Sequence, residues 1–383
     1  GNYSVTASLN GCSTTQNVQV YEPIYVAKTG FDATGDGSFG SPFKTIQKGI
    51  DEASEGQKIY VLPGTYKEGE LDFETAANSG VYKNVYIASD LVRLDDSSAI
   101  ASTIIDADGD EFLISISGSN SSIIQGFTLT GQEAGSNWES SVLRLQSGAN
   151  LTFRDLIIRD NSPASNAEEA QVMNVRYQRT KVVFDNVLFK DNGDQNDQSR
   201  KTAFIYNYAS VDFINCTWEG NYGWESVVRV QNYASAYFEN NLFVNNYAGD
   251  WGIVDIHDSY SKMTFMNSSI VNNLDVNNDR ALLGIGGNNN TVEFINSVLG
   301  SPTSNQDMIR NNSSTTNSFI AGNSVLSKDT VDGATYSNKL VWDVDATNIM
   351  SDPQLDTDGT LLATSPAIGI ATKKPVTIGA TTY

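Results

Sequence analysis

An internal repeat constrains this chain more than any other feature of its sequence. Seven segments begin with phenylalanine, and their first residues are 26, 31, 29, 25, 27 and 29 positions apart. A repeat of this length predicts one structural unit that stacks on copies of itself. The segments are FTLTGQEAG, FRDLIIRDN, FDNVLFKDN, FINCTWEGN, FENNLFVNN, FMNSSIVNN and FINSVLG, beginning at Phe127, Phe153, Phe184, Phe213, Phe238, Phe265 and Phe294.

Asparagine or aspartate occupies two fixed places in most of these segments. Asparagine tolerates a left-handed backbone and bonds its neighbours through its amide, so we expect a bend in every repeat and hydrogen bonds between stacked asparagines. The first place, two residues after phenylalanine, holds Asp155, Asn186, Asn215, Asn240, Asn267 and Asn296. The second place, eight residues after it, holds Asn161, Asn192, Asn221, Asn246 and Asn273.

An alternating segment precedes most of the phenylalanines: VLRLQ, VMNVR, AFIYN, VVRVQ, IVDIH and LLGIG. Its second and fourth residues are apolar and its third and fifth usually are not, as a strand with one buried face requires. A coil of short strands with this period predicts an all-β protein, a right-handed parallel β-helix with the phenylalanines in one buried column. A propeller would need a longer period and antiparallel hairpins, which the sequence lacks.

The chain divides into two parts. Residues 1–22 predict a terminal hairpin with strands at Tyr3–Leu9 and Asn17–Tyr21. This hairpin resembles the end of an immunoglobulin-like module, and the alternative of a strand pair belonging to the main domain stays open. Residues 23–383 predict the β-helix. Ile46, Ile50 and Ala53 recur at helical spacing, so we expect a short helix that caps the first turn.

Composition excludes some partners. The formal net charge is -21, from 45 acidic and 24 basic residues, and it repels nucleic acid and anionic membranes. No apolar run reaches eighteen residues, so we expect no membrane insertion of this chain. Cys12 and Cys216 lie in different contexts and predict no disulfide framework.

Residues 24–383 resemble the pectate-lyase-like superfamily of parallel β-helix proteins, most clearly at their two ends. Tyr25 to Ile50 follow the pattern YVA..G.D..GDGS...PF.TIQ.(G/A)I, and Asp352 to Gly369 follow DPQL...SPAIG, both typical of bacterial surface members. The resemblance implies a secreted or surface-displayed protein that is part of a larger multidomain chain. It does not specify an activity, because this fold hosts lyases, hydrolases, adhesins and tailspikes.

The outward positions of the alternating strands predict two polar columns along one face. Strands of neighbouring coils lie about 4.8 Å apart, so we expect Arg229, Asp255 and His257 to cluster in a groove that binds a polar glycan. The alternative is an exposed ion pair between Arg229 and Asp255 beside an ordinary histidine. The first column is Arg144, Asn174, Ile205, Arg229, Asp255 and Gly284, and the second is Gln146, Arg176, Asn207, Gln231, His257 and Gly286.

Three tryptophans stand shortly before these strands: Trp138, Trp224 and Trp251. Exposed tryptophans stack on the apolar faces of sugar rings, and three on one side of the coil predict a platform for a bound glycan. The alternative is that they pack beneath the loops as part of the core.

The sequence contains no catalytic motif that we can match. Lyases of this superfamily need a basic residue with calcium or a second arginine, and hydrolases need facing carboxylates. We therefore expect a non-catalytic, adhesin-like module that binds a glycan, with a polysaccharide lyase or glycoside hydrolase acting on an acidic polysaccharide as the alternative. No cofactor is required, although Asp106, Asp108 and Asp110 form an alternating trio that suits calcium or, equally, an ordinary turn.

Overall fold

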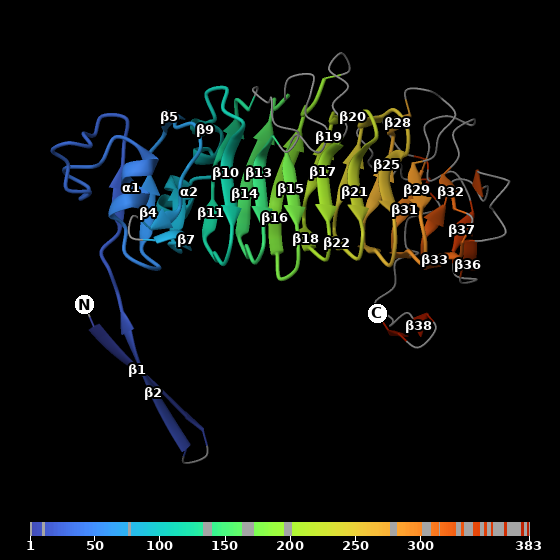
Figure 1. Ribbon diagram of the computed structural model, residues 1–383, viewed down its shortest axis with the longest axis horizontal. Coiled ribbons are helices and arrows are strands. Elements are labelled where there is room, and N and C mark those ends of the chain that lie inside the picture. Colours follow the sequence, from blue (N-terminus) through green and yellow to red (C-terminus); the bar gives the residue numbers. More distant parts are fainter. Residues whose placement is uncertain are drawn as a thin grey trace.

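The computed structural model describes residues 2–9, 12–75, 78–132, 140–162, 172–194, 201–275, 282–300, 308–313 and 315–326, with short pieces after residue 330. The chain is all-β, with 55% strand and 6% helix. Its parallel sheets wind around one axis as a β-solenoid, seen from the side in Figure 1. The parallel β-helix predicted from the repeat is confirmed.

A hairpin precedes the solenoid. β1 (Asn2–Leu9) pairs antiparallel with β2 (Cys12–Gln19), and Figure 1 shows the pair projecting away from the first coils. The second strand begins at Cys12, earlier than predicted, because Cys12 pairs with Leu9 and so belongs to the ladder. The origin of this hairpin in an immunoglobulin-like module stays a prediction.

The largest sheet, with 21 strands in the described residues, takes two consecutive stretches from most coils. In β14 and β16 the two stretches are one continuous strand. The first stretches are β3 (Ile24–Val26), β4 (Lys58–Val61), β8 (Tyr86–Ser89), β11 (Ile123–Gln125), β14 (Thr152–Arg159), β16 (Lys181–Lys190), β18 (Ser210–Ile214), β22 (Ser235–Glu239), β26 (Lys262–Met266), β30 (Thr291–Ile295), β33 (Asn317–Gly322) and β36 (Leu340–Val344). The second stretches are β5 (Gly64–Lys67), β9 (Thr103–Asp106), β12 (Thr128–Thr130), β19 (Thr217–Glu219), β23 (Leu242–Val244), β27 (Ser269–Val271), β31 (Val298–Leu299), β34 (Val325–Leu326) and β37 (Ile349–Met350).

A second parallel sheet, with nine strands in the described residues, closes the coil and is called the loop-side sheet below. Its strands are β10 (Phe112–Ser117), β13 (Ser141–Gln146), β15 (Met173–Arg176), β17 (Lys201–Tyr206), β21 (Ser226–Gln231), β25 (Gly252–His257), β29 (Leu283–Gly286), β32 (Ile309–Asn312) and β35 (Val331–Asp332). The short strands β20 (Tyr222–Gly223), β24 (Tyr247–Ala248) and β28 (Leu274–Asp275) stack beside it. The remaining elements are β6 (Glu74–Thr75), β7 (Asn78–Tyr82), α2 (Asp90–Leu94), α3 (Ala99–Ser102), β38 (Thr377–Ile378) and β39 (Thr381–Thr382).

The core contains the predicted phenylalanine column. Six of these side chains are fully buried, and five successive pairs of rings lie 4.5 to 5.3 Å apart: Phe153, Phe184, Phe213, Phe238, Phe265 and Phe294. One repeat is out of register, because Phe153 pairs with Ile124 and not with Phe127. A second buried stack, of Phe189, Trp218 and Phe243, lies five residues further along each coil.

Asparagine organises the bends in two different ways. At the first fixed place the residues adopt φ between 50° and 57°, so the predicted left-handed bend is present in each repeat from Asp155 to Asn296. At the second place the asparagines are fully buried and donate from Nδ2 to the Oδ1 of the next asparagine over 2.9 to 3.0 Å. This ladder satisfies amides that would be costly to bury alone.

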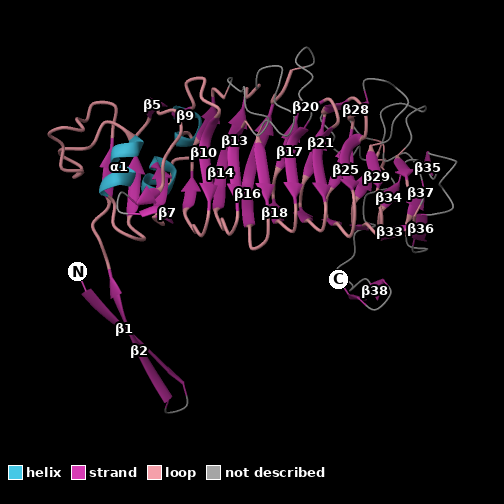
Figure 2. Ribbon diagram, in the orientation of Figure 1, coloured by secondary structure: helices cyan, strands magenta, loops and turns pink. Residues whose placement is uncertain are grey.

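The N-terminal end of the solenoid is covered by α1 (Ile46–Glu52), shown in cyan in Figure 2. Ile46, Ile50 and Ala53 are all buried, as their helical spacing predicted. Thr45 caps the helix by accepting a hydrogen bond from Lys48 N. Within the described residues, no helix combines the length and the apolar character needed to span a membrane.

Candidate functional site

The outer face of the loop-side sheet carries the predicted columns, but with one strand in a different register. Asn174 pairs with Phe204, and Phe204 pairs with Arg229, so Phe204 and Tyr206 point outward in β17. Ile205 faces the core and is fully buried, which corrects the predicted placement of Ile205 and Asn207. The alternation of apolar and polar residues predicted the wrong register for β17, because two aromatic side chains lie on its outer face. These are Phe204 and Tyr206, whose rings stack with centroids 5.1 Å apart.

Arg229 and Asp255 form the predicted contact and belong to a larger chain of charges. Arg229 Nε lies 2.5 Å from Asp255 Oδ2, and Arg229 Nη1 lies 2.5 Å from Glu225 Oε2. Lys201 Nζ lies 3.0 Å from the same Glu225 oxygen. The four side chains expose only 0 to 15% of their surface. The pair is thus neither an open groove floor nor an exposed ion pair, but a buried charge cluster.

Burial changes the chemistry of Asp255. Loss of hydration raises the pKa of this carboxyl above its usual range, while Arg229 and His257 act in the opposite direction. Its Oδ1 atom is buried without a hydrogen-bond partner among the described residues. That atom points toward β29, where a Cβ at Gly284 would lie 2.9 Å from it and 2.1 Å from the Trp251 carbonyl oxygen. A side chain at position 284 would collide with the Trp251 backbone, so this position of β29 requires glycine.

The tryptophans have unequal positions. Trp251 lies over the buried charge cluster, with its ring 5.7 Å from the Arg229 guanidinium and 5.1 Å from the His257 ring. Trp224 is 40% exposed and rests against Gly249, the residue that takes its place in the next coil. Neither side chain is fully buried, so both can contact a ligand. Trp138 lies outside the described residues.

The other predicted residues do not all join this cluster. Arg144 on β13 lies 5.0 Å from the Phe112 ring, and Arg176 on β15 is 2% exposed and donates to Asn174. Both stand on the far side of Phe204 from Arg229. His257 Nδ1 lies 3.2 Å from Asp258 Oδ1.

The acidic trio proposed for calcium does not form a donor set. Asp106 Oδ1 accepts from the Asp108 amide, Asp108 pairs with Lys67, and Asp110 Oδ2 accepts from the Glu70 amide. Among the described residues, no group of three or more histidine, cysteine or carboxylate side chains could hold a metal ion. Calcium binding stays a prediction.

The structure reveals an exposed aromatic row that the sequence reading missed. Tyr208, Tyr233 and Tyr260 project from the turns that follow β17, β21 and β25, and they are 43 to 57% exposed. Their rings stack with centroids 4.8 and 5.1 Å apart. We call these three residues the tyrosine ladder. Each stands five residues before a core phenylalanine, so the repeat did contain the signal.

The backbone at these positions is left-handed, with φ of 68°, 63° and 55°. Bulky residues rarely adopt this conformation, in which glycine, asparagine and aspartate cost least. The equivalent place holds Arg179 in the preceding coil and Asn289 in the following one, both also with positive φ. Strained residues that persist in a rigid scaffold concentrate at ligand sites.

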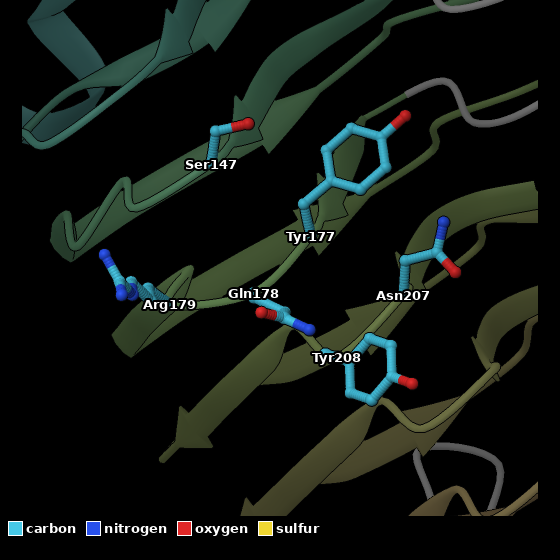
Figure 3. Close-up of a pocket in the computed structure, with 6 residues that line it drawn as sticks. All are labelled: Ser147, Tyr177, Gln178, Arg179, Asn207 and Tyr208. Atoms are coloured by element: carbon cyan, nitrogen blue, oxygen red, sulfur yellow. The ribbon is translucent and has the colours of Figure 1, made fainter.

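A hollow of about 480 Å³ opens at one end of the tyrosine ladder. Figure 3 shows the six side chains that line it: Ser147, Tyr177, Gln178, Arg179, Asn207 and Tyr208. Its size is within the range of small-ligand pockets. The turn that carries Tyr177 and Arg179 is anchored by buried Thr180, whose hydroxyl donates to Arg176 O and accepts from Gly148 N.

The solved structures that are similar to this chain share little sequence with it. No family model and no curated protein matches the sequence. The solved structure of XylC with xylose has a TM-score of 0.42 and 10% identity, covering 88% of this chain and 87% of that chain. Pectate lyase Pel9A has a TM-score of 0.37 and 17% identity, covering 91% of this chain and 89% of that chain. A rhamnogalacturonan lyase has a TM-score of 0.39 and 13% identity, covering 86% of this chain and 87% of that chain. The parallel β-helix architecture itself rests on the stacked parallel sheets of this chain.

Proposed function

We propose that this chain binds a glycan along the tyrosine ladder and does not cleave it. The stacked, half-exposed rings of Tyr208, Tyr233 and Tyr260 carry this proposal. Tyrosine offers rigid, partly apolar contact area with a polar tip, and such surfaces suit sugar rings. Because the ladder rises one coil at a time, an extended chain lying along the solenoid axis meets a new ring at each coil.

Burial of the charged groups supports binding without turnover. Hydrolysis of a glycosidic bond needs two carboxylates that reach the scissile bond. Glu225 and Asp255 are held by Lys201 and Arg229 and are shielded from solvent. Trp224 and Trp251 would extend the binding surface from the ladder toward the loops. We place this activity outside the cell or on its surface, within a larger multidomain protein.

Binding to a panel of soluble polysaccharides tests the proposal. Pectate, rhamnogalacturonan and xylan belong in it because the similar structures bear those names or bind xylose. Tyr233→Asn removes the central ring but keeps a residue that tolerates the left-handed turn, as at Asn289. We expect this variant to bind about tenfold more weakly, since tyrosine is often an energetic centre of an interface.

Tyr3→Ala, which removes an exposed tyrosine of the hairpin, is the matched control and should bind normally. Equal binding by wild type and Tyr233→Asn would contradict the proposal. The same panel, assayed for new reducing ends and unsaturated uronates, tests the alternative. Sustained release of either product would establish a hydrolase or a lyase.

A further inference from the structure

In the coil before the tyrosine ladder, an arginine occupies the place that tyrosine holds in the ladder. Arg179 stands five residues before Phe184, as Tyr208 stands five before Phe213, and the two have φ of 67° and 68°. Arg179 and Tyr208 both line the hollow at this end of the ladder. We infer that this hollow is a subsite for one sugar residue that carries an anionic substituent, a carboxylate or a sulfate ester. The inference rests on the proposed glycan binding and specifies its ligand.

Arg179 differs in its contacts from other arginines of the chain. It is exposed and makes no ion pair or hydrogen bond with any described residue. By contrast, Arg93, Arg154 and Arg159 each pair with a neighbouring aspartate. In a protein with a net charge of -21, a guanidinium that has no carboxylate partner among the described residues and lies beside a hollow is available to an external anion.

The hollow also offers what a sugar ring needs. The ring of Tyr208 stacks on Tyr233 on one side, and in the described residues no second ring stacks on it. Tyr177 lines the same hollow and is 41% exposed. The Ser147 hydroxyl and the amides of Gln178 and Asn207 supply donors and acceptors for ring hydroxyls. Figure 3 shows Gln178 beside Tyr177 and Asn207 beside Tyr208, with Ser147 on the turn of the preceding coil.

The turn is built to hold this arrangement. Tyr177 and Arg179 both have positive φ, of 70° and 67°, within a turn of four residues. Buried Thr180 fixes the turn through its two hydrogen bonds. Two strained bulky residues in one anchored turn indicate that their side-chain directions matter more than the local backbone cost.

A negative charge at the other end of the tyrosine ladder restricts the charge that a ligand can carry. Asp258 lies on the turn of Tyr260, keeps 41% of its side chain exposed, and accepts a hydrogen bond from Gln231 Nε2 over 2.6 Å. An anionic group near Tyr260 would be repelled, whereas one near Arg179 would be attracted. The fitting ligand is therefore a largely neutral chain with a single anionic residue at the Arg179 end. A uniformly charged polyanion fits poorly.

Matched oligosaccharides test this inference on the full chain by calorimetry. The probes are hexasaccharides on xylan-, glucan- and galactan-type backbones, each neutral, with one uronic acid, or with one sulfate ester. The variants are Arg179→Asn, Arg179→Lys and Tyr233→Asn, and Arg159→Gln removes one exposed arginine elsewhere as the control. We expect wild type to prefer a singly charged probe over its neutral parent by about tenfold, the scale of a charge-assisted hydrogen bond.

Arg179→Asn should abolish that preference and leave neutral binding unchanged, while Arg179→Lys retains part of it and Arg159→Gln all of it. The preference should also shrink at high salt, because the guanidinium is exposed. The uronate and sulfate arms identify which anion is recognised. If neutral probes bind through Tyr233 but Arg179→Asn changes nothing, the inference fails and the proposed function stands. If no probe binds, or Tyr233→Asn has no effect, both fail.

Discussion

The rings of Phe238 on β22 and Phe265 on β26 stack with centroids 4.5 Å apart and planes 4° from parallel. The two residues are register partners on adjacent parallel strands, and both are fully buried. Phe213 stacks on the other side of Phe238 at 5.0 Å. A central member of this column therefore has aromatic neighbours on both sides.

Replacing Phe238 with alanine should lower the free energy of unfolding by about 3–5 kcal/mol, because the lost ring leaves a cavity between two rigid neighbours. Urea denaturation followed by circular dichroism measures it. Phe31→Ala is the control, since Phe31 is 67% exposed and its removal should cost no more than about 0.5 kcal/mol. Similar costs for the two variants would contradict a buried phenylalanine column.

Most of the core could be predicted because each side chain returns to the same face of the coil after one repeat. The phenylalanine column, the left-handed bends and the asparagine ladder all follow from residues at a fixed place in the repeat. Phe127 is the exception: it is buried, but Ile124 takes its expected place opposite Phe153. The sequence shows that a segment repeats, but it does not show where a bend shifts the register.

The candidate site was less predictable, for two physical reasons. Phe204 was assigned to the interior because it is apolar, yet it lies on the outer face, 5% exposed and 4.8 Å from Lys201 Nζ. The periodicity of apolar residues does not reveal that other side chains cover the outer face of a strand, where an apolar residue can then also be buried. The tyrosine ladder was missed because left-handed turns favour glycine or asparagine. Tyrosine at such places is an exception, and this exception is one basis of the binding site proposed above.

The contribution of the buried charge cluster to stability should increase as the pH falls. Because burial raises the pKa of Asp255 above its ordinary 3.8, the folded chain binds this proton more readily than the unfolded chain does. The contribution of this group to stability therefore rises as pH falls through the raised pKa and becomes constant below about 3.8. We expect the stability of wild type relative to Asp255→Asn to increase as the pH is lowered from 7 to 4.

Thermal unfolding of both proteins across that range measures this difference, and the comparison cancels the titration of carboxylates outside the charge cluster. Arg229 keeps Glu225 as a partner in the variant, so folding should survive. A relative stability that falls on acidification would show that the pairing with Arg229, and not burial, dominates the pKa of Asp255.

The two cysteines should differ sharply in reactivity. Cys216 is buried, and its burial raises the pKa of the thiol to about 12, so almost none of it is thiolate at pH 8. Cys12 is exposed in the hairpin. Iodoacetamide at pH 8 should modify Cys12 alone in the native protein and both residues in denaturant, as mass spectrometry of peptides would show. Rapid native labelling of Cys216 would mean that its coil opens readily.

The two described tryptophans of the predicted groove should respond differently to truncation. Trp224 is 40% exposed and touches Gly249, so Trp224→Ala should weaken glycan binding by about 1–3 kcal/mol while leaving the free energy of unfolding unchanged. Trp251→Ala should also lower stability, because its ring covers the Arg229 guanidinium and packs against His257. Calorimetric titration with the best polysaccharide of the panel, paired with urea denaturation, separates the two effects. Unchanged affinity in the double variant would confine the binding surface to the tyrosine ladder.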